Sequence, residues 1–486
     1  MTQHRHRSSK LLALAAVIAL VAAACSEAED EGTSAATSTP DADSIAVETD
    51  DDTEPTEDDE ITNDTEANSA ETNSDEESEA VDDGSVVFQF GGEDWFMGEV
   101  PTTAVASDPD AEPIKIGLIN QEDTPLGSFP EVRGGVEAAA AWVNAELGGV
   151  DGRPIEIISC VSSFSVEQSQ GCAQELVQDD VVALVGGIDV TSNGSIPVLQ
   201  QNGIPVVGGI PANLAEQQSE LNFFFSGGVA GAMAAMIAHA EMNGAESVMI
   251  AYGEFESFEV TARDYAAPVA ESLGMRVVLQ PFPIVGADML QVLTSASDAD
   301  VDALIVAAAD TSCVPVMEGA VQLELRSQLY LVGACAAETI LEAAGSSAAG
   351  VVFSAEGPPD PDDVEGAIFD AVVQEYATGP AGGAGTVGFR SLMNLYALLL
   401  EIGADNIEPA TITALVQDAV DRPSFWGHPY TCDGNRVPGL PALCAPEQGL
   451  FTTTGVPGAD LVFLPEGFEE TDGWVETDEL FQSALL

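Results

Sequence analysis

The chain has 486 residues, with 82 Asp and Glu against 12 Lys and Arg, and a formal net charge of −70. Its hydrophobic fraction of 45% excludes wholesale disorder, and its length is sufficient for two or more compact units. The charge excludes proteins that hold nucleic acid through its phosphates or adhere electrostatically to anionic membranes, because both need a basic surface.

The first 25 residues have the pattern of an export signal. Met1–Lys10 carries basic residues, Leu11–Val21 is an apolar run, and three alanines precede Cys25. The run is shorter than the roughly 20 residues of a transmembrane helix. A cysteine after small residues is similar to a bacterial lipobox, although Ala22 replaces the usual leucine, and this implies a lipidated N-terminus. Ordinary signal cleavage with a free Cys25 is the alternative.

An acidic tract follows, with 24 Asp and Glu and no Lys or Arg between Ser26 and Ser85. It shows no apolar periodicity, so the sequence predicts a disordered, self-repelling linker. From Val86 onward, nine basic residues stand against 58 acidic ones, a net charge of −49. A high-salt habitat, where screening is strong, is one hypothesis for this acidity. Trp95 and Phe96 follow the linker and are predicted to pin a short strand to the body, or alternatively to dock a partner.

The next 200 residues alternate between apolar strands and helices. This alternation predicts an α/β fold with parallel sheets covered on both faces, in two blocks. The predicted strands are Ile114–Ile119, Ile155–Ser159, Val181–Gly187, Ile204–Gly209, Ser247–Tyr252, Met275–Phe282 and Ala303–Ala309. The predicted helices are Val132–Gly149, Ser165–Gln178, Asn193–Asn202, Ala230–Gly244, Phe258–Leu273 and Met289–Ser297.

Six cysteines remain after Cys25, and an even number in an exported protein indicates disulfides. Six cysteines allow 15 connectivities, among which the sequence alone does not choose. Pairing of sequence neighbours, the arrangement we favour, gives Cys160–Cys172, Cys313–Cys335 and Cys432–Cys444. A zinc site would need close pairs such as C-x₂-C, and the chain has none. The sequence therefore predicts neither a metal nor a cofactor.

The segment from Ile114 to Cys160, with its run N-A-E-L-G-G-V-D-G-R, resembles the N-terminal part of type I periplasmic binding proteins of the branched-chain amino acid group. The resemblance continues through VVALVGGIDVTSNGSIPVLQQNGIPVVGG and more weakly to about Phe463. It implies two doubly wound Rossmann-like lobes that close over a small ligand, with a cleft between them and a three-stranded hinge. It also supports the Cys160–Cys172 pairing, because some members place a disulfide there.

The resemblance and the composition together predict the following division of the chain. It comprises a signal (1–25), an acidic linker (26–85), an ordered or semi-ordered lead-in (86–112), lobe one (113–227), lobe two (228–355), a return to lobe one (356–405), a return to lobe two with the disulfide loop (406–470), and a C-terminal tail (471–486).

Ligands of open α/β sheets bind beyond the carboxyl ends of the strands, near free N–H groups. The loops that follow the predicted strands therefore supply the predicted contacts. These are Gln121, Ser128, Phe129, Asp189, Val190, Thr191, Ser192, Gly209 and Ile210 in lobe one, and Tyr252, Glu254, Asp310 and Thr311 in lobe two.

Several of these positions depart from the family pattern. Asp189-Val190-Thr191 stands where branched-chain amino acid binders often have Ser-Ser or Ser-Gly, and Ile210-Pro211-Ala212 replaces an Ala-Thr pair. The expected aromatic residue falls near Ser257, and the acid that would pair with a ligand ammonium falls near Cys335. Asp189, Glu254 or Asp310 could supply a compensating carboxylate.

Each candidate also has a structural alternative. Asp189 either holds a ligand cation or caps the following helix. For Thr191 and Ser192 we favour a role as helix caps over a role as ligand contacts. Tyr252 and Phe255 either wall the ligand or pack between the lobes.

An enzyme is the rival class, but the chain has no G-x-S-x-G, P-loop or H-E-x-x-H motif. After the signal it has only two histidines, and His239 has a core-like apolar setting. A sensory ectodomain is a third class. The sequence favours a monomeric, lipid-anchored binding protein outside the cell membrane. It would deliver an amino acid, or an amide, urea-like or small carboxylate solute, to an ABC permease, and it would bind no nucleic acid.

Overall fold

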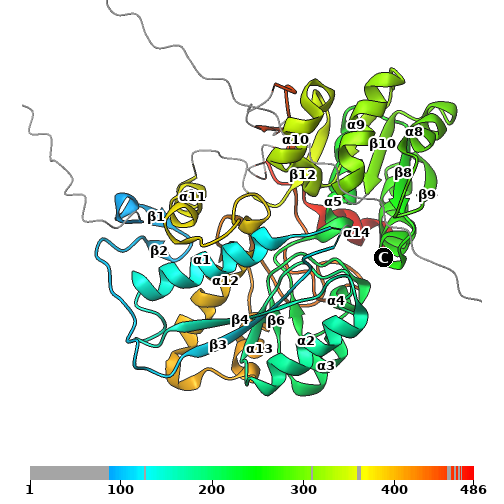
Figure 1. Ribbon diagram of the computed structural model, residues 1–486. Coiled ribbons are helices and arrows are strands. Elements are labelled where there is room, and N and C mark those ends of the chain that lie inside the picture. Colours follow the sequence, from blue (N-terminus) through cyan, green and yellow to red (C-terminus); the bar gives the residue numbers. More distant parts are fainter. Residues whose placement is uncertain are drawn as a thin grey trace, which may run out of the picture. The chain divides into compact units, whose positions relative to one another are not determined.

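The computed structural model describes residues 87–124, 127–307, 310–357, 363–456, 461–464, 467–468, 471 and 473–486. All of them belong to one compact unit, Ala80–Leu486. The predicted signal, Cys25 and the acidic linker lie outside the described residues. Within this unit the chain builds two sheets, each covered by helices, which we call lobe one and lobe two (Figure 1).

Lobe one contains a five-stranded, wholly parallel sheet of order β4-β3-β5-β6-β7. The central strand, β5, is apolar throughout, as expected for a strand of a sheet that helices cover on both faces. The strands are β3 (Ile114–Asn120), β4 (Ile155–Val161), β5 (Ala183–Val185), β6 (Val206–Val207) and β7 (Asn222–Phe223). On one face lie α1 (Pro130–Ala145), α11 (Val364–Tyr376), α12 (Gly385–Ile402) and α13 (Pro409–Gln417); on the other lie α2 (Val166–Gln178) and α3 (Ile196–Asn202).

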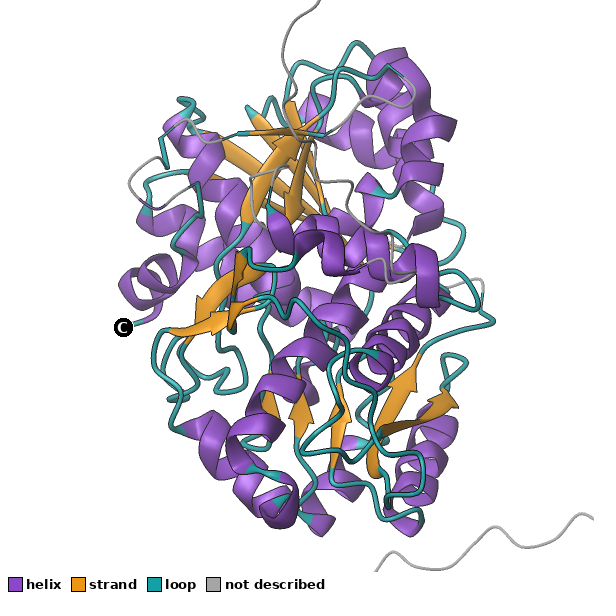
Figure 2. Cartoon of the chain, turned by 90° about the vertical axis from the view of Figure 1, so that its left-hand side faces the viewer, coloured by secondary structure: helices purple, strands orange, loops and turns teal. Residues whose placement is uncertain are grey.

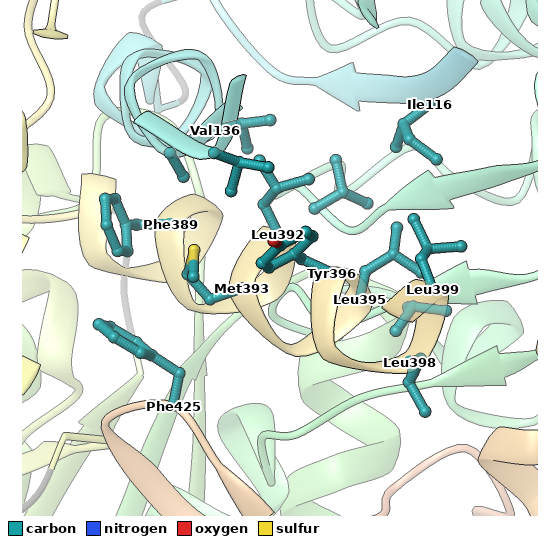
Figure 3. Close-up of a cluster of buried hydrophobic side chains, with 14 of the residues drawn as sticks. Ile116, Val136, Phe389, Leu392, Met393, Leu395, Tyr396, Leu398, Leu399 and Phe425 are labelled. Atoms are coloured by element: carbon teal, nitrogen blue, oxygen red, sulfur yellow. The ribbon is translucent and has the colours of Figure 1, made fainter. Parts of the chain in front are cut away.

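The packing of α1 along α12 depends on glycine. A Cβ at Gly135 would lie 2.1 Å from the Gly385 carbonyl oxygen, and a Cβ at Gly388 would lie 2.1 Å from the Val132 oxygen. Both distances are impossible for real atoms, so the two backbones approach this closely only where no side chain intervenes. Figure 3 shows the apolar cluster beneath this contact, in which side chains of α12 lie near those of α1 and β3. Pro130 at the first helical position starts α1 in the way that proline permits.

Lobe two contains a seven-stranded sheet of order β16-β15-β12-β11-β10-β8-β9. The strands β9, β8, β10, β11 and β12 run parallel, and β15 and β16 extend the sheet antiparallel. Figure 2 shows helices on both sides of the strands. The strands are β8 (Ser247–Gly253), β9 (Arg276–Phe282), β10 (Ala303–Ala307), β11 (Gln328–Leu331), β12 (Val352–Ala355), β15 (Gly449–Thr452) and β16 (Val462–Phe463).

Two hydrophobic clusters cover the two faces of this second sheet. One comes from α5 (Gly228–Met242), α6 (Glu256–Val260), the π-helical η2 (Thr261–Ala266), α7 (Ala267–Ser272) and α14 (Thr477–Leu485). The other comes from α8 (Met289–Asp298), α9 (Cys313–Gln322), η4 (Gly333–Ala336), α10 (Glu338–Ala344) and η5 (Gly345–Ala348), and a short turn, η3 (Asp310–Ser312), precedes α9. Among the described residues, no helix combines the length and the hydropathy needed to cross a membrane.

Before β3, the lead-in packs on lobe one. It contains η1 (Val87–Phe90) and a small antiparallel pair, β1 (Asp94–Trp95) and β2 (Gly98–Glu99). Trp95 is buried in the lobe-one core, with its ring 5.7 Å from that of Trp142 and 6.3 Å from that of Phe425. The prediction that Trp95 pins a short strand to the body is confirmed.

The chain passes between the lobes three times, and residues 358–362 of the second passage lie outside the described residues. The first crossing joins β7 to α5, the second leaves β12 toward α11, and the third runs from the hairpin β13 (Arg422–Ser424) and β14 (Gly427–Tyr430) to β15. The first and third crossings pair through their backbones, since Phe224 N–H donates to Ala442 and Cys444 N–H donates to Phe224. A short turn, η6 (Ala404–Asn406), precedes α13, and α4 (Leu214–Gln217) precedes β7.

Several predicted bounds differ from the structure. The segment 409–432, expected in lobe two, has Ile412, Val416 and Tyr430 in the lobe-one core, because α13 packs against α12. The following residues 437–443 do contribute to a lobe-two cluster, as expected. The helix expected from Asn193 begins at Ile196, since hydrogen-bonded turns occupy the residues before it. The strand expected at Ile204–Gly209 pairs only at Val206 and Val207. The three neighbour disulfides are all present, with Cα–Cα distances of 5.5, 5.4 and 4.6 Å.

Candidate functional site

Three loops of lobe one meet at the carboxyl ends of β3, β5 and β6. Gln121 N–H donates to the Ile188 oxygen at 2.8 Å, and Ile210 N–H donates to the Gly187 oxygen at 3.3 Å. A Cβ at Gly186 would lie 1.9 Å from the Gly208 oxygen, so the second and third loops touch backbone to backbone. The strand order therefore assembles Gln121, Asp189 and Ile210 at one edge of the sheet, as the sequence predicted.

Asp189 lies inside this edge, with 3% of its surface exposed. Its Oδ1 accepts from Ser162 Oγ at 2.9 Å, and its Oδ2 accepts from Ser169 Oγ at 2.6 Å. Oδ1 also accepts from the Thr191 N–H at 3.0 Å and the Thr191 hydroxyl at 2.8 Å. Both carboxylate oxygens thus accept hydrogen bonds from groups of lobe one. The bond from the Thr191 N–H, two residues further along the chain, forms a turn of the kind that Asp favours. These contacts shape the loop and do not cap the following helix, because α3 begins at Ile196 with Ser195 as its N-cap. The predicted cap at Asp189 is therefore wrong, and the predicted ligand contact stays a prediction.

A second buried carboxyl group, Glu216, lies near Asp189. A small cavity is lined by both residues, by Ser192 and by apolar side chains of lobe one. Glu216 Oε2 accepts from the Ala212 N–H at 2.9 Å and the Asn213 N–H at 3.1 Å, and so closes the turn before α4. Burial, followed by the negative charge of Asp189, raises the pKa of Glu216 well above its usual range. Sequence reasoning missed Glu216, because an acid in so acidic a chain carries no local signal.

The first loop holds its own polar contacts. Gln121 is fully buried and its Nε2 donates to the Gly127 oxygen at 2.8 Å, while its Oε1 has no hydrogen-bond donor in the described part of the chain. Ser128 is exposed and accepts from the Asp123 N–H at 3.2 Å. The Phe129 oxygen accepts from Asn120.

Beside this first loop, Glu122 forms a bidentate pair with Arg133, with both N–O distances 2.9 Å. Burial raises the pKa of Glu122, but its hydrogen bonds to Arg133 and Asn120 and the charge of Arg133 together lower the pKa by more, so the net shift is downward. This corner of lobe one therefore keeps a carboxylate and its guanidinium together.

The remaining lobe-one candidates act through their backbones. The Val190 oxygen accepts from Asn213 at 3.0 Å, and the Gly209 N–H donates to Ser391 Oγ on α12 at 2.7 Å. Thr191 and Ser192 are buried in the turn that precedes α3. The predicted use of their amides for a ligand stays a prediction.

In lobe two, the loop after β8 reaches toward lobe one. The Phe255 ring lies 6.4 Å from the ring of Phe164, which follows β4 of lobe one, and 6.0 Å from that of Phe258. Glu254 is exposed, and its N–H donates to the Phe282 oxygen at 2.7 Å. Tyr252 is buried, and burial raises the pKa of its hydroxyl. The aromatic contact joins the lobes, as the packing alternative for Phe255 predicted.

The loops after β10 and β11 are cross-linked to each other. Cys313 begins α9, just after the predicted contacts Asp310 and Thr311, and its disulfide partner Cys335 lies in η4. Thr311 is exposed, whereas the side chain of Asp310 lies outside the described part of the structure. Because Cys335 is in a disulfide, it offers a ligand no charge.

A buried ion pair ties the crossings together, and the sequence analysis did not identify it. Arg390 of α12 is 6% exposed; its Nη2 donates to Glu356 Oε2 at 2.8 Å and its Nη1 to the Glu356 carbonyl at 2.6 Å. Glu356 directly follows β12, and its other oxygen accepts from Ser226 in the first crossing. The available signal was an arginine within the apolar helical run GFRSLMNLYALLLEIG, since arginine is rarely buried unless it is paired.

Glu365 makes a similar connection at the start of α11. Its carboxylate accepts from the Phe96 N–H of the lead-in at 2.6 Å and from the Trp426 N–H beside the β13–β14 hairpin. Burial raises the pKa of Glu365 to about 7. The segments near the crossings thus depend on two carboxyl groups, the partly buried Glu356 and the buried Glu365.

The family model described as periplasmic binding protein matches residues 113–434. The chain belongs to the periplasmic binding protein family. It has the two-lobed type I fold, and family membership makes it a solute-binding protein with an extracytoplasmic location. Among curated protein sequences, none matches.

Solved structures share this fold. A solute-binding protein of an ABC transporter from Rhodopseudomonas palustris HaA2, in complex with p-hydroxybenzoic acid, has a TM-score of 0.62 and 19% identity over 73% of this chain and 96% of that one. The leucine-binding protein LivK of Thermotoga maritima has a TM-score of 0.60 and 17% identity, with 72% and 97% covered. LivJ of Streptococcus pneumoniae, in complex with isoleucine, has a TM-score of 0.58 and 18% identity, with 73% and 100% covered.

Proposed function

We propose that this protein is the extracytoplasmic substrate-binding lipoprotein of an ABC importer. It captures a small polar solute by closure of the two lobes and passes it to permease subunits. The observation that supports this proposal most directly is the pairing of two open α/β lobes through three crossings, with strand-end loops of both lobes in contact at Phe164 and Phe255. A branched-chain or related amino acid is the first candidate ligand, as in the similar LivJ and LivK proteins.

A carboxylate solute without an ammonium group is the second candidate. The position where the family resemblance implies an acid for the ammonium falls near Cys335, which is in a disulfide with Cys313. Asp189, one proposed substitute, spends its carboxylate on Ser162, Ser169 and Thr191. Burying a ligand ammonium without a partner would cost several kcal/mol. Structural neighbours that hold aromatic carboxylates also support this candidate.

Matched ligands distinguish the two candidates. Thermal shift and calorimetry would compare leucine with 4-methylpentanoate, which lacks only the ammonium, and with leucinamide, which lacks only the carboxylate charge. A site for amino acids prefers leucine to both analogues. A site for carboxylates prefers 4-methylpentanoate or 4-hydroxybenzoate, and a site for amides or urea-like solutes responds to acetamide or urea. A ligand at 100 times its Kd raises stability by about 2.7 kcal/mol. No response in any panel, together with turnover of a substrate, would instead favour an enzyme.

The lipid anchor needs its own experiment, because Cys25 lies outside the described residues. Labelled fatty acid should enter the wild-type chain and a Ser26→Ala control, but not Cys25→Ala, and the Cys25→Ala protein should leave the membrane fraction. Label and membrane association that persist in Cys25→Ala would contradict acylation at this residue.

A further inference from the structure

Three side chains with metal-ligating atoms meet where the third crossing contacts the C-terminal helix. His428 belongs to β14, Glu447 lies just before β15, and Glu476 lies directly before α14. One ligand atom from each of the three lies within 4.8 Å of the others. The group lies apart from the strand-end loops of the proposed ligand site, and no short sequence motif unites it, because its members are 19 and 29 residues apart.

Glu447 is the buried member of this group, with none of its side chain exposed. Its Oε1 pairs with Arg436, whereas its Oε2 is buried and has no hydrogen-bond partner among the described residues. Oε2 lies 3.3 Å from His428 Nδ1, so it is directed into the cluster. A buried carboxylate oxygen without a donor is costly, and in native proteins such an atom commonly marks an ion or water.

The two ring nitrogens of His428 face different acidic side chains, Nδ1 toward Glu447 and Nε2 toward Glu476. Its Nδ1 lies 2.7 Å from the Pro429 carbonyl oxygen, an acceptor, so the neutral imidazole carries its proton on Nδ1. Nε2 then presents a lone pair, 3.9 Å from Glu476 Oε1. A cation between Nε2 and this carboxylate would satisfy both acceptors. A backbone carbonyl that holds the other ring nitrogen is the usual support of a metal-bound histidine.

The charges around the group also favour a cation. Arg436 faces two carboxylates, since its Nη2 pairs with Glu447 and lies 3.3 Å from Asp478 Oδ2. When His428 is neutral and the three acids are ionised, the cluster of Glu447, Glu476, Asp478 and Arg436 carries a net charge of −2. The single guanidinium does not neutralise the three carboxylates, and a divalent cation would balance the remaining charge. The partly exposed Glu476 connects the cluster to solvent, from which an ion could enter.

We propose that His428, Glu447 and Glu476 bind a first-row divalent cation such as Zn²⁺. One imidazole nitrogen and two carboxylates form a donor set that suits Zn²⁺, whereas Ca²⁺ and Mg²⁺ prefer oxygen ligands alone. The ion would join β14 and the end of the third crossing to the start of α14, which packs on α5 and α7 of lobe two. It would thus fasten the C-terminal helix to the hinge.

The test is Zn²⁺ titration of the full chain, by calorimetry with a competing chelator, for the wild type, His428→Gln, Glu476→Gln and Glu479→Gln. Glu479 is exposed at the start of α14 and contributes no ligand atom to the cluster, so its variant makes the same charge change nearby without removing a ligand. His4, His6 and Cys25 are present in every variant, so differences in affinity report the proposed site alone. Zn²⁺ affinity should fall at least about tenfold in His428→Gln and Glu476→Gln and change less than about twofold in Glu479→Gln.

Thermal midpoints with and without metal provide a second measurement. Zn²⁺ should raise the midpoint of the wild type and of Glu479→Gln, and raise it less in the two ligand variants. Should His428→Gln fail to fold, the partly exposed Glu476→Gln still decides the question. Equal Zn²⁺ affinity in the wild type and Glu476→Gln, an equal loss in Glu479→Gln, or an equal response to Mg²⁺ would overturn the proposal.

Discussion

The Asp189 loop and the hinge region both bury carboxylates, but they stabilise them in different ways. Asp189 receives its hydrogen bonds from serine and threonine groups of lobe one alone. Glu356 receives Arg390 from α12 and Ser226 from the first crossing, so one carboxylate holds segments 130 and 34 residues away in sequence.

Asp189 therefore stabilises the shape of one loop, whereas Glu356 connects segments that are distant in the sequence. Neutral donors around Asp189 can be replaced one at a time, with a net loss of about 1 kcal/mol each. A buried ion pair behaves otherwise, because removal of one partner leaves the other charge buried and unpaired. Damage to the hinge should therefore affect the whole protein, whereas damage to the Asp189 loop should stay within lobe one.

The largest effect is expected for Arg390→Met, which removes the guanidinium and leaves the Glu356 carboxylate without its charge partner. The free energy of unfolding at pH 7 should fall by about 3–5 kcal/mol, measured by urea denaturation. Arg422→Met is the control, because Arg422 pairs with the exposed Glu401 and should cost about 1 kcal/mol or less. Similar losses in both variants would show that burial of the pair is unimportant.

A pH-dependent effect is expected for Glu365→Gln. Because the folded pKa of Glu365 is about 7 and an unfolded glutamate titrates near 4.3, the folded state keeps the proton longer. Stability from Glu365 is therefore greatest below about pH 4.3 and declines as the pH rises through about 7, by up to about 3 kcal/mol. The unfolding free energy of the wild type minus that of Glu365→Gln should fall over this range. A difference that is independent of pH would contradict the raised pKa.

Asp189→Asn should cost about 2 kcal/mol, because the amide presents two donors to side chains that are themselves donors. If Asp189 shapes its loop, unfolding free energy falls while the affinity for the identified ligand changes less than about threefold. Lost affinity with an unchanged melting temperature would instead make Asp189 a ligand contact. Improved affinity for anionic ligands would make it a selectivity gate.

The smallest effect is expected for Ser226→Ala, about 1 kcal/mol, since Arg390 still pairs with Glu356 when this hydroxyl is lost. Ser128→Ala, which removes an exposed hydroxyl, is the matched control and should be nearly neutral. A loss in Ser226→Ala as large as that in Arg390→Met would mean that the first crossing, rather than the ion pair, holds Glu356.

The parts of the fold that a local sequence pattern encodes could be predicted from the sequence. The apolar run from Ile114 predicted β3, and the alternation after it predicted both lobes. The antiparallel addition of β15 was not predicted, because its pairing with β12 joins residues about 100 positions apart. Strand ends located the Asp189 loop correctly, but the direction of the carboxylate depends on Ser162 and Ser169, which lie in other elements. Glu216, Glu356 and Glu447 were hidden by the abundance of acids.

The lead-in around Trp95 packs into the core of lobe one, and the chain continues from lobe one to lobe two through the crossings. A pulling force applied through the N-terminal segment therefore enters lobe one first and spreads through the Trp95–Trp142 contact into its core. Lobe two receives that load through the crossings and through the Phe164–Phe255 contact. Relative to an attachment point at the N-terminus, lobe one is therefore the stationary lobe. When the lobes close, lobe two moves with respect to that point.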